Sequence, residues 1–325
     1  MMRTIKILLF ALPLLAALQS SFAGSCIELK QTDAALILQR GDTPILTYHI
    51  KAVEPPEGVD KAYRRSGFIQ PLHAPSGGVV TGIHAGDHYH HIGLWHAWVN
   101  TRYQGYDSGH KQKTGPDFWN LGGKTAFIRH SGILETRKSG FTVKQEHLAY
   151  LDGYGKKPTV ILEETFSVDA QFKDGANIVD YDFTQTNVTK KALEFPAYRY
   201  GGGLAYRGPA FWNKENSDYL TSTGLDRTNS HATRAKWIAM YGPTEECGKN
   251  PATVSIFCHP SNFDSPQRLR TWDNGKMFFN YVPVQEKPWS RKPGKAETLR
   301  YRLVVSDGKP NKDIIEKQFQ AYAKQ

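Results

Sequence analysis

Short runs of alternating apolar and polar residues, separated by turn residues at even intervals, dominate this chain of 325 residues. Residues 159–189 contain two long alternating runs joined at Lys173-Asp174-Gly175-Ala176, which is a hairpin signal. Similar runs occur at 35–50, 124–151, 252–259, 276–284 and 297–308. This spacing predicts an all-β fold, a large antiparallel β-sandwich, rather than alternating strands and helices.

The tail is the one segment whose pattern predicts a helix. In NKDIIEKQFQAYAKQ, residues 311–325, the apolar residues Ile315, Phe319 and Tyr322 fall on one face. The sequence shows no internal repeat and no low-complexity linker. We therefore expect residues 24–325 to form a single β-sandwich domain that ends in a short helix.

The first residues have the pattern of a secretory signal peptide. Arg3 and Lys6 precede an apolar run over about residues 7–18, and small residues follow near Ala23. We expect residues 1–23 to be cleaved and the protein to be periplasmic or secreted. Lipid anchoring at Cys26 is a lesser alternative, because the leucine expected three residues earlier is missing. No later segment is long and apolar enough to span a membrane.

Charge and cysteine content restrict the partners. The formal net charge of +10 falls to +8 when Arg3 and Lys6 leave with the signal peptide. The basic residues are interleaved with acidic ones, so no basic patch for nucleic acid is predicted. Three cysteines are too few for a disulfide framework, although Cys247 and Cys258 could pair in an oxidising compartment.

The segment GDHYHHIGLW, residues 86–95, concentrates histidines. On a regular strand, His88 and His90 share one face and His91 lies on the other with Trp95. His96 would be roughly 26 Å from His88 along such a strand and cannot join them. Any third group for a site must come from elsewhere in the fold, and the candidates are His84, Asp117, His130 and His259.

Histidines beside an aspartate can act as general acids and bases near neutral pH. The nearby Trp95, Trp98, Phe118 and Trp119 offer the flat apolar faces on which a sugar ring stacks. An open metal site from His88, His90 and Asp117 is an alternative. The chain has no CxxC or HExxH pattern, and we expect a pocket that works without metal or other cofactor.

Two further segments supply candidate residues. Arg199 and Arg207 flank three successive glycines, and a guanidinium can bind sugar hydroxyls or a carboxylate in a bidentate way. His259 follows a strong β-run at a point where a strand passes into a loop. Glu163 and Glu164 must point to opposite faces of their strand, so at most one of them can face a cleft.

Several of these segments together resemble a known family. They are RRSGFIQPLHAPSGGVVT at 64–81, DHYHHIGLWHAW at 87–98, DFWNLG at 117–122, HPSN at 259–262, FFNYVP at 278–283 and KPGKAETLRYRLVVSDG at 292–308. This resembles the DUF6807 family, which also carries the label methane oxygenase PmoA, over about residues 60–310. Gln70 and His73 depart from its pattern. The resemblance implies a galactose-mutarotase-like supersandwich.

The oxygenase label does not fit the chain, because membrane methane oxidation needs apolar spans of roughly twenty residues. We expect an exported carbohydrate-active protein, of epimerase, lyase or hydrolase type, that acts on a small-molecule or oligosaccharide substrate. The alternatives are a glycan-binding module without catalysis and, less favoured, a metal-dependent oxygenase. The predicted catalytic residues are His88, His90, His91, Asp117 and His259, and the predicted substrate-binding residues are Trp95, Trp119 and Arg199.

Overall fold

The computed structural model describes residues 26–103 and 115–325. The predicted signal peptide, residues 1–23, lies outside the described residues, so export stays a prediction. Among the described residues, no helix has the length and apolar character that a membrane span requires.

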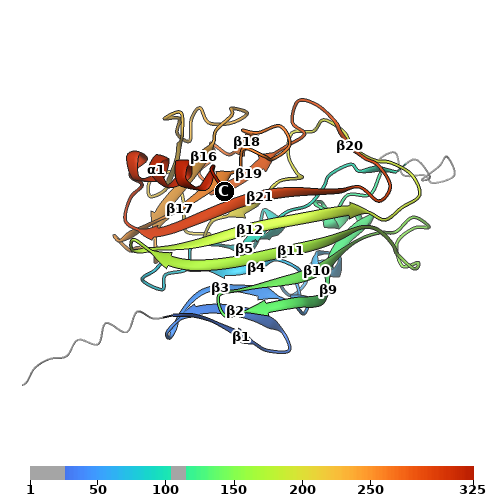
Figure 1. Cartoon of the computed structure of the whole chain (residues 1–325), viewed down its shortest axis with the longest axis horizontal. Helices are drawn as coiled ribbons and strands as arrows, with labels where there is room; N and C mark the ends of the chain where they lie inside the picture. The colour runs from blue at the N-terminus through green and yellow to red at the C-terminus, as the bar shows by residue number, and fades with distance from the viewer. Residues whose placement is uncertain (1–25, 104–114) are drawn as a thin grey trace, which may run out of the picture.

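Two eight-stranded sheets lie face to face (Figure 1). In spatial order, the first sheet contains β1 (Ile27–Gln31), β2 (Ala35–Arg40), β3 (Thr43–His49), β4 (Ile69–Leu72), β7 (Leu94–Trp95), β14 (Ala205–Arg207), β19 (Phe278–Val282) and β18 (Arg268–Thr271). The second contains β15 (Asp218–Thr221), β16 (Trp237–Pro243), β17 (Pro251–Cys258), β21 (Ala296–Asp307), β12 (Ala176–Asn187), β11 (Thr159–Lys173), β10 (Gly140–Ala149) and β9 (Ala126–Arg137).

The remaining strands form two small sheets. One contains β20 (Trp289–Arg291), β13 (Leu193–Phe195) and β8 (Arg102–Tyr103), and the other contains β5 (Ile83–Ala85) and β6 (His88–Ile92). Two 3-10 turns, η1 (Lys61–Tyr63) and η2 (Leu121–Gly123), complete the connections. The predicted hairpin is present, since Lys173 pairs with Ala176 where β11 turns into β12.

The main core lies between the two large sheets. Leu38 and Leu46 from the first sheet pack in one cluster with Phe166, Tyr181 and Leu303 from the second. Alternate residues of these strands are buried, as the sequence pattern requires. The predicted large antiparallel sandwich is confirmed.

A single α-helix, α1 (Lys312–Tyr322), covers the outer face of the second sheet in the described part of the chain (Figure 1). The Asn311 side chain caps it by accepting hydrogen bonds from the backbone N–H groups of residues 313 and 314. Ile315, Phe319 and Tyr322 are the buried residues of the helix, so the predicted apolar face is confirmed. They pack on Trp237 and Phe257 of the sheet.

The cysteines stay unpaired. Cys247 is exposed in a turn, whereas Cys258 is buried at the end of β17, with its thiol near the side chains of Asn262 and Ser265. The pairing that the sequence allowed between Cys247 and Cys258 is absent from the structure.

Candidate functional site

An irregular hairpin brings the histidines of β6 together. His88 pairs with Ala85 and Ile92 pairs with Ile83, so three residues of β6 stand opposite His84 alone. This extra length is a bulge, which breaks the strict alternation of side chains. The prediction that His91 faces away from His88 and His90 is therefore wrong, because all three histidines line one pocket.

The pocket opens on the face of the first sheet that points away from the main core. Leu94, Tyr206, Leu269 and Phe279 point into the main core. Their chain neighbours in β7, β14, β18 and β19 therefore point to the opposite face. Arg270 and Phe278 line the pocket for this reason, and Trp95 lies beneath it.

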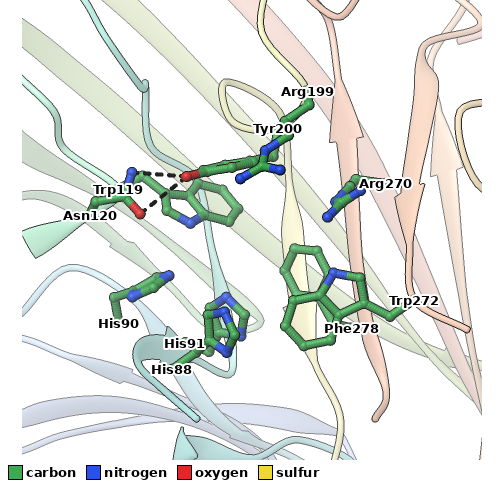
Figure 2. A pocket seen from close by; sticks show the side chains of 10 residues that line it. All are labelled: His88, His90, His91, Trp119, Asn120, Arg199, Tyr200, Arg270, Trp272 and Phe278. Carbon is green, nitrogen blue, oxygen red and sulfur yellow. Dashed lines mark hydrogen bonds between the residues drawn. The ribbon is translucent and has the colours of Figure 1, made fainter. Parts of the chain in front are cut away.

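Ten residues from four distant segments of the chain line this pocket (Figure 2). They are His88, His90, His91, Trp119, Asn120, Arg199, Tyr200, Arg270, Trp272 and Phe278. The volume is about 450 Å³ including solvent at the mouth.

His91 forms the rigid floor of the histidine group. Its ring stacks between those of His88 and Phe278, with centroid separations of 4.7 Å on both sides, and it is 1% exposed. Arg207 donates to Nδ1 of His91 over 3.2 Å. Because a guanidinium cannot accept a hydrogen bond, this nitrogen carries no proton. Burial, with the charges of neighbouring groups, lowers the pKa of His91 well below its usual value.

His88 is oriented by a carboxylate. Its Nδ1 lies 2.9 Å from Oδ2 of Asp87, so the Nδ1–H donates to that oxygen. Asp87 also pairs with Arg207 at 3.0 Å and Lys276 at 3.1 Å. Burial opposes ionisation of Asp87, but the hydrogen bond from His88 and these two cations lower its pKa. His88 thus has its other nitrogen, Nε2, free of hydrogen-bond partners among the described residues.

His90 is a neutral group at neutral pH. Burial, reinforced by His88 and Arg207, lowers its pKa to about 3. Its ring meets that of His91 edge to face at 4.7 Å. A neutral imidazole offers one donor and one acceptor, which suits hydrogen bonding to a hydroxyl group.

Asp117 does not line the pocket but positions two residues that do. Its Oδ1 accepts from the backbone N–H groups of Trp119 and Asn120 at 2.9 and 2.8 Å, and its Oδ2 accepts from the Asn120 side chain at 2.7 Å. The structure does not place the Asp117 carboxylate in the pocket lining with His88 and His90, and its catalytic role stays a prediction. Its carboxylate is engaged by this turn.

Asn120 and Tyr200 are paired across the pocket (Figure 2). The Asn120 amide donates to the Tyr200 hydroxyl over 3.1 Å, and that hydroxyl lies 3.3 Å from the amide oxygen. Burial raises the pKa of Tyr200 to about 12, so it stays protonated. The three glycines place this segment, because a Cβ on Gly202 would overlap the Trp98 ring.

Trp95 and His259 do not line the pocket. Trp95 is 0% exposed and supports Trp119 from below at 5.1 Å between ring centroids. Its predicted role as a stacking platform is wrong. His259 packs on Tyr322 of α1 at 5.1 Å and bonds to Ser261. Because its partners lie at the helix, His259 cannot act with the histidines of β6.

His84, His130 and Arg207 also lie outside the pocket lining. His84 is the middle residue of β5, opposite the bulge of β6, and His130 contacts the Tyr48 hydroxyl through Nδ1. Arg207 is buried behind His91 rather than exposed to a ligand. The predicted site residues that do line the pocket are His88, His90, His91, Trp119 and Arg199.

The sequence interpretation missed Asn120, Tyr200, Arg270, Trp272 and Phe278. A usable signal was the segment RTWDNG at 270–275, which places an arginine and a tryptophan directly before a turn. Trp272 is half-buried and its ring lies 4.9 Å from that of His88. It offers the accessible aromatic face that Trp95 lacks.

A second polar group lies inside the sandwich. Oε2 of Glu164 is 2.7 Å from Nε2 of His96, 3.0 Å from Nε2 of His147 and 2.8 Å from the Gln185 amide nitrogen. Burial alone would raise the pKa of Glu164, but His96 and His147 lower it well below its usual value. Glu164 is therefore an interior anion held by three N–H donors.

His96, His147 and Glu164 form the one group of potential metal ligands found among residues 26–103 and 115–325. Trp98 and Arg291 both donate to the Gln185 amide oxygen, at 2.8 and 2.9 Å, which turns its NH₂ toward Glu164. Oε2 of Glu164 thus accepts from three N–H groups, whereas its Oε1 is buried without a hydrogen-bond partner among the described residues.

The chain was compared with known proteins. The sequence pattern described as "Family of unknown function (DUF6807)" matches residues 35–320. A search of the curated proteins found no match. Among solved structures, a galactose mutarotase related enzyme from Lactobacillus acidophilus is 9% identical, with a TM-score of 0.40, covering 87% of this chain and 97% of that one.

Two larger proteins are also similar. Heparan sulfate lyase HepC from Pedobacter heparinus is 10% identical, with a TM-score of 0.35, covering 85% of this chain and 34% of that one. The GH36 α-galactosidase AgaA from Geobacillus stearothermophilus is 10% identical, with a TM-score of 0.36, covering 87% of this chain and 40% of that one. The chain thus spans well under half the length of these two proteins.

Proposed function

The chain belongs to the DUF6807 family, and from this premise we propose that its pocket binds a sugar on which the protein performs proton-transfer chemistry. One observation carries the proposal. Accessible aromatic rings share a small pocket with several neutral hydrogen-bonding groups and with a histidine oriented by a carboxylate. Export of the protein is part of the same proposal and rests on the pattern of residues 1–23.

The lining suits a sugar because it combines flat apolar faces with directional polar groups. Trp272 and Tyr200 offer ring faces against which the C–H groups of a sugar can pack. His90 offers a donor and an acceptor, as a hydroxyl group requires, and the Asn120 amide oxygen offers an acceptor. A purely apolar ligand would leave these polar groups without partners, which costs free energy.

His88 is the best candidate for the proton-transfer group. The Asp87 carboxylate holds its Nδ1–H, so Nε2 remains as the basic nitrogen at the pocket. A general base needs this kind of orientation by a third group. Burial and neighbouring positive charges lower the pKa values of His90 and His91, which favours a hydrogen-bonding role for them.

The lining favours epimerisation or elimination over hydrolysis. Glycoside hydrolysis commonly uses two carboxyl groups that flank the scissile bond. None of the described lining residues is Asp or Glu. Asp87 lies behind His88 and is already bonded to it, to Arg207 and to Lys276. Epimerisation and elimination require only a positioned acid and base, which imidazole and phenol groups can provide.

A second candidate function is a glycan-binding module without catalysis. The neutral state of His90 and His91 favours it, because both side chains then bind hydroxyl groups without titrating near neutral pH. Both functions require a sugar in the pocket. They differ in whether His88 catalyses a reaction of the bound sugar.

The test separates binding from turnover. A glycan array identifies ligands for the wild type, and calorimetry then compares Trp272→Ala with Tyr154→Ala, a matched change of an exposed aromatic outside the pocket. We expect Trp272→Ala to weaken binding about tenfold or more and Tyr154→Ala to leave it unchanged. Equal binding by both variants, or no sugar bound by the wild type, would contradict the proposal.

Turnover is followed by NMR of the bound sugar in D₂O, which detects exchange of a C–H proton, epimerisation or elimination. We expect His88→Gln to lower the rate by about 10²–10⁴-fold with little change in affinity. Binding without turnover by the wild type would favour the glycan-binding module.

A further inference from the structure

Two arginines stand at one side of the pocket without a carboxylate partner. Figure 2 shows the guanidinium group of Arg199 beside Tyr200 and that of Arg270 above Trp272, on the same side of the pocket. Within the described residues, neither forms an ion pair with Asp or Glu. Burial and the positive charge of Arg199 both lower the pKa of Arg270, so the two cations are close enough to repel one another.

Nine other arginines of the described chain do have a carboxylate partner. Ion pairs to carboxylates neutralise Arg64, Arg129, Arg137, Arg207, Arg227, Arg234, Arg268, Arg300 and Arg302. The guanidinium groups of Arg199 and Arg270 thus bring positive charge to the pocket without a paired carboxylate.

The surroundings leave the charge of the two arginines available. Arg270 donates to Nε2 of His231 over 3.0 Å, which orients its guanidinium without neutralising it. Asp273 acts on Arg270 only at longer range. Glu286, which lies beside Arg199 in a neighbouring surface hollow, is already paired with Arg234 and Arg268.

We propose that the pocket recognises an anionic sugar, whose carboxylate or other acidic group lies between Arg199 and Arg270. This inference rests on the proposed function and specifies its substrate class. Guanidinium groups match carboxylates and phosphates with paired N–H donors, and such charged hydrogen bonds are the strong ones. The aromatic rings and His90 would then contact the sugar ring, and the arginines would select a uronate over a neutral sugar.

The experiment measures binding by calorimetry with four probes. D-glucuronate carries the carboxylate, its methyl ester removes only the charge, D-glucose is neutral, and D-glucose 6-phosphate carries a different anion at the same carbon. The proteins are the wild type, Arg199→Gln, Arg270→Gln, Arg270→Lys, and Arg129→Gln as a control. Arg129 is an exposed arginine outside the pocket.

We expect glucuronate to bind more tightly than its methyl ester and glucose, and each pocket substitution to weaken it about tenfold to a hundredfold. Arg129→Gln should have no effect, and Arg270→Lys should restore part of the affinity because it restores the charge. Tighter binding of glucose 6-phosphate, with the same dependence on the arginines, supports the anionic class and identifies the group as a phosphate.

The contradicting results are distinct. If the methyl ester and glucose bind as tightly as the anions, and the arginine variants match the wild type, this inference is wrong while the sugar-binding function stands. If no probe binds the wild type, the proposed function and this inference both fail.

Discussion

Glu164 is the residue on which the interior electrostatics of the sandwich depend. It lies on β11, it is 1% exposed, and one of its oxygens accepts from His96, His147 and Gln185. Each donor comes from a different part of the chain, so the carboxylate ties together strands β10, β11 and β12 and the segment after β7. An ion in such a site is stable only while its partners remain in place.

We expect Glu164→Gln to lower the free energy of unfolding at pH 7 by about 3 kcal/mol, because the donors lose their anion. Glu163→Gln is the matched control. Glu163 is adjacent on the same strand, its side chain is 42% exposed, and it pairs with Lys144. Its loss should cost less than about 1 kcal/mol. Urea unfolding followed by circular dichroism measures both, and equal losses would contradict this role of Glu164.

The difference in stability between the wild type and Glu164→Gln should depend on pH. The pKa of Glu164 is lowered in the folded state, whereas an unfolded glutamate has a pKa of about 4.3. The unfolded chain therefore binds a proton first, and the stabilisation by Glu164 is full above about pH 5 and is lost as the pH falls. The stability difference between the wild type and Glu164→Gln should shrink between about pH 5 and pH 3.

For individual residues, the sequence predicted the lining of the pocket only in part. The density of histidines at 88–91 identified the site, but the bulge opposite His84 decided that His91 joins it. Strict alternation cannot reveal such a bulge. The alternation rule did place Glu163 and Glu164 on opposite faces, yet it could not say which face is buried. That depends on His96 and His147, which are far from Glu164 in sequence.

Among the elements, α1 shows how a helix stabilises the outer face of a sheet. Phe319 is 4% exposed and meets Phe257 of β17 at 5.8 Å. Lys236 and Trp237 both bond to Glu316 at 2.7 Å, which fixes the helix on the sheet. The helix was predictable because its pattern is local. The order of the strands was not, since β12 pairs with β21, which is more than a hundred residues away.

We expect Phe319→Ala to destabilise the protein by about 3 kcal/mol, from lost burial and the cavity that remains. Ile314→Ala on the same helix is the control, because Ile314 is 56% exposed, and its effect should be within about 0.5 kcal/mol. Thermal unfolding by calorimetry compares the two. Similar melting temperatures would show that the helix contributes little to the stability of the sandwich.

In the whole molecule, the strands of the second sheet bury side chains on both of its faces, one toward the main core and one under α1. On β12, Val179 points into the main core and its neighbour Ile178 packs under α1. On β17, Ile256 and Phe257 are divided in the same way. Loss of either core would therefore expose the other side of these strands. The pocket depends on this shared framework, because its lining comes from segments that only the folded sheets bring together.

We therefore expect a single cooperative unfolding transition for residues 24–325, in agreement with the one domain that the sequence predicts. Tryptophan fluorescence reports mainly on the pocket side through Trp95, Trp98 and Trp119, and far-UV circular dichroism reports on all strands. The two signals should change at the same urea concentration. Phe319→Ala and Glu164→Gln, which alter opposite sides of the second sheet, should shift both signals together. Two separate transitions, with Phe319→Ala affecting only one of them, would show that the helix-covered side unfolds independently of the pocket.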